Sequence, residues 1–87
     1  PNPFSDFTQF TFELSKTSDI EINIYSLGGK KIFSIEKLNA PRGFNIINWN
    51  GQNNFGDVLA NGVYIYHIKA SNENEKTSSL GRIAKFK

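Results

Sequence analysis

His67 is the side chain best suited to acid–base or metal chemistry, and it is the only histidine in the chain. It lies between Tyr66 and Ile68 in an apolar run, and strand alternation places it on one face with Val63 and Ile65. A triad or a zinc site needs partners, but the eight acidic residues are dispersed singly and cysteine is absent. We therefore interpret His67 as a structural or solvated strand residue, and predict no catalytic residue and no enzymatic activity.

Oxygen ligands are concentrated in the loop Asn50 to Asp57, where asparagine side chains precede a single carboxylate. Amide and carboxylate oxygens suit calcium, yet the alternating acidic pattern of a calcium loop is missing. The composition favours an Asx-rich turn in which the side chains bond the nearby backbone, and calcium stays the alternative. The sequence therefore assigns no metal ligand and no cofactor.

The segment Gly28-Gly29-Lys30 has the composition of a phosphate-binding loop but not its spacing. No Ser or Thr follows the lysine and no helix pattern follows the glycines, both of which a phosphate loop requires. We interpret the segment as a hairpin turn.

An aromatic platform for sugars could be built from Trp49, Tyr64 and Tyr66. All three fall within strand patterns, so packing in a core or an interface is the favoured role. They belong to the stretch Trp49 to Ile68, around which the chain is organised. We assign a structural role there to these three aromatic residues and to the turn glycines Gly51, Gly56 and Gly62.

The bulk composition narrows the class of protein. The net charge is only +2 and the lysines are scattered, which argues against a nucleic-acid partner. No apolar run approaches the roughly 20 residues of a membrane span, and the chain has no cysteine for a disulfide. The 87 residues suit one domain. Because the chain opens at Pro1 and contains no methionine, we expect residues 1–87 to be a fragment of a longer protein.

Apolar and polar residues alternate with the period of two that is typical of half-buried strands. The pattern predicts strands at 10–14, 20–25, 32–38, 44–49, 63–70 and 80–87, with a seventh if the segment at Phe4 pairs. The first two should form an antiparallel hairpin about the polar turn Ser15 to Asp19. Alternation is imperfect in the third, where a bulge would reconcile Ile32 with Ile35 and a short helix is the alternative. Turns recur about every ten residues, which predicts an all-β, antiparallel immunoglobulin-like sandwich without a disulfide.

The whole chain resembles two related bacterial families. One is the C-terminal sorting domain of type IX secretion cargo from Bacteroidetes, and the other is the immunoglobulin-like domain of the flagellar hook-capping protein. The matching segments are, in family order, Pro1 to Phe4, Ile22 to Lys30, Gly43 to Gly51, Gly56 with Asn61 to Tyr66, and Arg82 to Lys87. The aspartate that usually follows the tryptophan is Asn50 here.

This resemblance implies that residues 1–87 are the C-terminal module of a longer secreted protein. The module would be non-catalytic, and the secretion machinery of the outer membrane would recognise it for export and surface attachment. A sortase would remove it at the cell surface, where a glycolipid anchor is added. Recognition is expected on the last strand, at Ile83, Lys85, Phe86 and Lys87, because a terminal strand can pair with a partner. The alternative is that this strand only completes the sandwich. The alternatives are a structural immunoglobulin-like spacer in a secreted enzyme or adhesin, and a carbohydrate-binding module.

Overall fold

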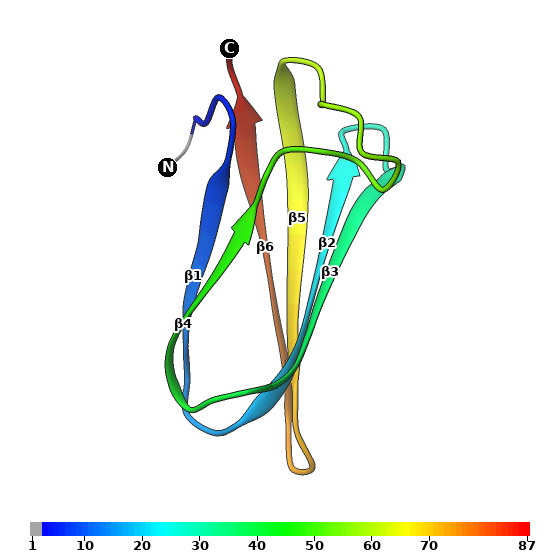
Figure 1. Cartoon of the computed structure of the whole chain (residues 1–87). Coiled ribbons are helices and arrows are strands. Elements are labelled where there is room, and N and C mark those ends of the chain that lie inside the picture. The colour runs from blue at the N-terminus through cyan, green and yellow to red at the C-terminus, as the bar shows by residue number, and fades with distance from the viewer. Residues whose placement is uncertain (1–2) are drawn as a thin grey trace.

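The computed structural model describes residues 3–87, which form six strands and no helix (Figure 1). The strands are β1 (Thr8–Leu14), β2 (Ser18–Ser26), β3 (Lys31–Ala40), β4 (Gly43–Trp49), β5 (Gly62–Ser71) and β6 (Lys76–Lys85). They make a two-stranded sheet, β1-β4, and a four-stranded sheet in the order β3-β2-β5-β6. All strand pairs are antiparallel, so the predicted all-β sandwich is confirmed.

The core lies between the two sheets, where each strand contributes one face. Alternate residues of β1 and β4 point inward, among them the buried Phe10, Ile47 and Trp49. Opposite them, Ile20, Ile22 and Ile24 of β2 have no exposed surface. The period-two alternation of the sequence thus gives each sheet one apolar face, and the two apolar faces pack against each other.

The predicted hairpin between the first two strands is wrong. β1 pairs with β4, from Thr8 opposite Trp49 to Leu14 opposite Gly43, whereas β2 lies between β3 and β5 in the other sheet. The polar link after Leu14 therefore crosses from one sheet to the other. Both strands carry an apolar face, and placing the strands in opposed sheets lets each face cover the other, which pairing them side by side would not do.

The predicted irregularity in β3 is a bulge, and the short-helix alternative is wrong. The partner of Ile24 is Phe33 and the partner of Tyr25 is Lys31, so Ile32 is the extra residue. A second irregularity lies at the other end of the strand, where Asn39 has a φ of 55°. Such a backbone conformation is uncommon outside glycine, and asparagine is one of the residues that tolerate it.

The N-terminal segment does not form a seventh strand. Phe4 makes a single parallel bridge to Lys85 of β6, outside the six named strands. Pro1 and Asn2, the first residues of the family-like opening segment, lie outside the described residues. The segment at Phe4 therefore lies against the end of β6, as Figure 1 shows for the blue and red segments.

Candidate functional site

Trp49 is the hub of the aromatic core and is only 2% exposed. Its ring lies 5.5 Å from that of Phe4, 6.0 Å from Phe33 and 6.5 Å from Phe10, measured between centroids. The indole Nε1–H donates a hydrogen bond to the Gln52 carbonyl at 3.1 Å, so the polar edge of the buried ring is satisfied. Trp49 therefore offers no exposed face to a sugar.

The loop that follows Trp49 is shaped by its own side chains. The Asn53 Oδ1 accepts hydrogen bonds from the backbone N–H groups of Phe55 and Asp57, at 2.9 and 3.0 Å. The Asn50 Oδ1 accepts one from the Gln52 N–H at 3.2 Å. These are the Asx turns that the composition favoured. Across residues 3–87, no three His, Cys, Asp or Glu side chains gather to hold a metal ion.

Gly51 is the turn glycine whose position depends on its lack of a side chain. Its φ of 74° lies in the left-handed region, and a Cβ there would lie 3.0 Å from the ring of Phe4. The missing side chain lets the Phe4 ring pack against this turn beside Trp49. Two further glycines of the assigned motif, Gly56 and Gly62, also have positive φ, at 84° and 154°, in the loop and at the start of β5.

The four residues expected to form the recognition strand differ in burial: two are buried and two are exposed. Ile83 is buried in the core and Lys85 is only 3% exposed, whereas Phe86 and Lys87 are exposed. The Lys85 ammonium donates a hydrogen bond to the Leu59 carbonyl at 2.8 Å. The buried pair thus anchors the strand, and only the last two residues present their side chains to solvent.

The last residue is held by the side chain of Asn61. Its Oδ1 accepts a hydrogen bond from the Lys87 N–H at 3.0 Å, and its Nδ2 donates to the Lys87 carbonyl at 3.3 Å. The Lys87 ammonium also lies 3.8 Å from the Asp6 carboxylate, an exposed ion pair of small energetic value. The terminal backbone is therefore fixed while the Phe86 ring remains 74% exposed.

Phe4 holds the other side of the same strand end. Its N–H donates to the Ala84 carbonyl, and its carbonyl accepts from the Phe86 N–H, both at 2.9 Å. Its buried ring meanwhile packs on Trp49. The end of β6 is thus fixed by Phe4 on its outer edge and by Asn61 beyond its end.

We expect Asn61→Ala to release the last residues without unfolding the domain. The substitution removes both hydrogen bonds to Lys87, which in this exposed setting should lower the free energy of unfolding by about 1 kcal/mol. Amide hydrogen exchange at Lys87 should accelerate at least tenfold, as measured by NMR. Asn54→Ala, at an exposed residue of the preceding loop, is the control. Unchanged exchange at Lys87 in the Asn61 variant would contradict the assignment.

Tyr64 and Tyr66 both face inward from β5. The Tyr64 hydroxyl donates to the Ala60 carbonyl at 2.6 Å. The Tyr66 ring packs edge-on against Phe10 at 5.2 Å and lies across the backbone of Gly81 in β6. Both tyrosines pack against the core. Gly81, which was not among the structural residues assigned from the sequence, allows the Tyr66 ring to lie this close to β6.

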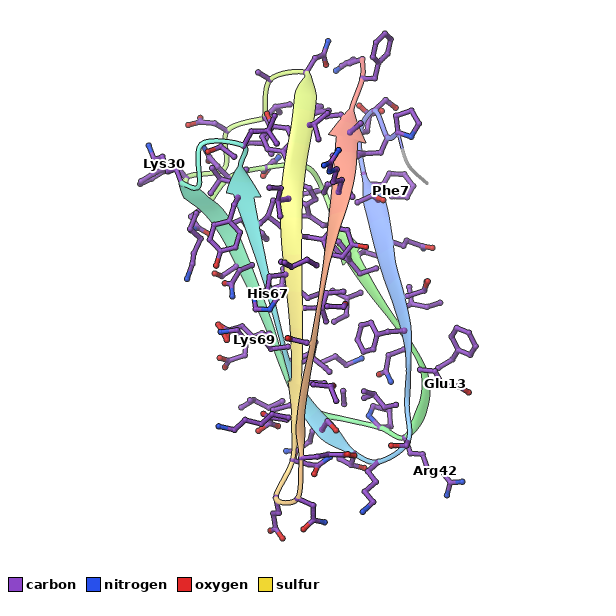
Figure 2. The ribbon with its side chains drawn as sticks, turned by 180° about the vertical axis from the view of Figure 1, so that it is seen from behind. Phe7, Glu13, Lys30, Arg42, His67 and Lys69 are labelled. Atoms are coloured by element: carbon purple, nitrogen blue, oxygen red, sulfur yellow. The ribbon has the colours of Figure 1, made fainter. Side chains whose placement is uncertain are left out.

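His67 lies on the outer face of the four-stranded sheet, and Figure 2 shows it beside Lys69 on β5. Its neighbour across the sheet is Asn23, which is buried although it faces outward. The Asn23 Oδ1 accepts a hydrogen bond from the Ser34 hydroxyl at 2.6 Å, and its Nδ2 donates to the Glu21 carboxylate at 3.2 Å. His67 thus borders a hydrogen-bonded polar network formed by Asn23, Ser34 and Glu21.

Helices capable of crossing a membrane are not found within residues 3–87.

Comparison with protein families gives one match over nearly the whole chain. The family model described as "CHU_C Type IX secretion signal domain" matches residues 3–83. No curated protein matches the sequence.

Two solved structures share the fold. One is FlgD from P. aeruginosa, with a TM-score of 0.75 and 18% identity, in a match that covers 91% of this chain and 61% of that one. The other is dimeric latent PorU from Porphyromonas gingivalis, with a TM-score of 0.79 and 20% identity. That match covers 98% of this chain and 8% of the PorU chain. At these identities the likeness concerns the fold alone.

Proposed function

Since the chain belongs to the CHU_C type IX secretion signal domain family, whose members are exported to the cell surface or secreted, we propose that it is the C-terminal sorting module of a longer protein. In this proposal the secretion machinery of the outer membrane recognises the folded domain. A sortase then removes it at the cell surface, where the parent protein is attached. The domain itself carries out no reaction.

The observation that supports a specific recognition site is the fixed, exposed end of β6. Phe86 presents its ring to solvent while Phe4 and Asn61 hold the backbone on either side of it. An exposed aromatic side chain on a fixed backbone, next to a lysine, is the type of surface that a protein partner uses as an anchor, because the backbone does not have to be ordered on binding. We assign direct contact to Phe86 and Lys87, and the positioning of the strand to Ile83 and Lys85.

An export assay tests the sorting role. Residues 1–87 are fused to the C-terminus of a reporter that carries a signal peptide, in a host with intact type IX machinery. We expect the reporter outside the cell, and retention in the periplasm when the machinery is deleted. Periplasmic retention in both hosts, with the domain folded, would contradict the proposal and favour the structural spacer.

Point variants then test the recognition site, because deleting residues 82–87 would also remove the buried Ile83 and Lys85. Phe86→Asn combined with Lys87→Glu should lower export at least tenfold and leave the free energy of unfolding within about 0.5 kcal/mol of the original. Phe55→Asn is the matched control, since that ring is 90% exposed but lies in the loop. Equal export by all three proteins would remove the assignment to Phe86 and Lys87.

A further inference from the structure

The free edge of β6 is open along the first half of the strand. β6 is the last strand of its sheet and pairs with β5 on one side, in a register that runs without a shift from Lys76 to Lys85. At its far end, the groups that bond Phe4 belong to Ala84 and Phe86. Backbone groups alternate between the two sides of a strand, so the N–H and C=O groups of Ser78 and Leu80 also point away from β5.

The opposite edge of the same sheet is protected, which sets β6 apart. β3 has two register irregularities, and its Ile32 carbonyl accepts a hydrogen bond from the Asn54 N–H of the central loop. Charged residues also line it. Bulges, charges and covering loops are the usual means of blocking an edge. Between Thr77 and Gly81, β6 has no register shift, no proline and no charge.

Next to this edge, a cleft lies between β1 and the Arg82–Ile83 part of β6. It has a volume of about 210 Å³, and its apolar lining comes from Phe10, Tyr66, Ile68 and Ile83. The β6 residues on the inner face before the cleft, Thr77, Ser79 and Gly81, are small, and Ser79 and Gly81 lie opposite the half-buried Ile68 and Tyr66. A strand added to β6 would direct alternate side chains over this apolar surface.

The outer face of the same strand has a different character. Lys76, Ser78, Leu80 and Arg82 lie on it, and Lys69 of β5 is opposite Ser78. Leu80 is exposed between the two basic residues of β6. An added strand would meet positive charge on this side, and acidic side chains would be complementary to it.

We propose that the free edge of β6 from Thr77 to Gly81 binds an extended segment of a partner protein as a fifth strand of the sheet. The segment would place large apolar side chains inward, over Tyr66 and Ile68, and acidic side chains outward, beside Lys76 and Arg82. This surface differs from the Phe86–Lys87 site, and its use in export rests on the proposed sorting function.

A second copy of the chain is a poorer occupant. Two β6 strands paired edge to edge would each present small inner residues, so neither would fill the cleft of the other. Pairing about Ser79 would also bring Lys76 beside Arg82 of the other copy, which places like charges together.

The test uses the whole chain and a capped seven-residue peptide in which glutamate alternates with isoleucine. NMR should show slowed exchange of the Ser78 and Leu80 amides when the peptide is added. A peptide with lysine in place of glutamate should bind at least tenfold more weakly. Ser78→Pro should also lose at least tenfold in affinity, because it removes an edge N–H without touching the ladder to β5. Glu36→Pro, on the opposite edge of the sheet, is the matched control.

Failure to bind, or equal binding by the Ser78 and Glu36 variants, would overturn the inference. A dimer that Ser78→Pro dissolves would show that a second copy takes the edge, and would overturn it too. Export of the reporter without peptide binding would contradict the inference about the β6 edge and would still support the sorting role. Peptide binding without export of the reporter would contradict only the sorting role, and would still support β6 as an edge that accepts an added strand.

Discussion

Replacing Trp49 with alanine is expected to lower the free energy of unfolding by about 3–5 kcal/mol. Domains of this size are stable by about 0.05–0.15 kcal/mol per residue, so this change removes roughly a quarter or more of the total. The reason is that the ring contacts three aromatic residues, one from the N-terminal segment and two from different sheets, while its Nε1–H bonds the central loop. Denaturant unfolding followed by circular dichroism measures the effect.

Phe44→Ala is the control for Trp49→Ala, because Phe44 lies on the same strand but faces solvent, 76% exposed. We expect it to change the free energy of unfolding by less than about 0.5 kcal/mol. Trp49→Phe separates packing from the indole hydrogen bond, since it keeps a ring but leaves the Gln52 carbonyl without its donor. Similar losses for the Phe44 and Trp49 alanine variants would show that Trp49 is not the hub.

Gly81→Ala is expected to destabilise the domain by about 1–3 kcal/mol although it adds a single methyl group. The new Cβ would clash with the outer end of the Tyr66 ring and with its hydroxyl oxygen. The ring cannot move inward freely, because it packs edge-on against Phe10. Thermal and denaturant unfolding measure the loss, and the Tyr66 ring resonances should shift.

The cost of Gly81→Ala should depend on Tyr66, which a double-mutant cycle tests. In a Tyr66→Ala background the added methyl group meets open space, and its cost should fall below about 1 kcal/mol. Gly28→Ala is the matched control, because its Cβ would lie 3.8 Å from the nearest atom, Ser26 Oγ, at ordinary contact distance. Additive effects of the Gly81 and Tyr66 substitutions would rule out the clash.

The sequence predicts the strands well because burial on one face of a sheet leaves a local trace. Alternation around Ile22 and around Phe10 was enough to place β2 and β1, and the break at Ile32 was enough to indicate a bulge. Pairing is different, since it depends on residues far apart in the chain. The partners of Phe10 and Ile22 are Ile47 and Ile68, and no local pattern distinguishes these from a hairpin.

In the expected recognition strand, the alternation of the sequence is enough to predict which residues are buried. Lys85 is two residues from Ile83, so both must lie on one face, and burial of Ile83 carries Lys85 inward with it. Asn61, Leu59 and Phe4 hold the strand end through contacts that only the folded chain creates. The fit of Gly81 under Tyr66 also requires the register of β5 against β6, which the sequence does not contain.

The parallel bridge between Phe4 and β6 has a mechanical consequence. The two segments run in the same direction, and two hydrogen bonds join them. Opposite pulls on the chain before Phe4 and after Lys87 act along the strands, so they load both bonds in shear at the same time. Shear breaks such bonds together, whereas peeling would break them one by one. A chain pulled from both ends therefore loads these two bonds together before the buried Phe4 ring can leave its place beside Trp49.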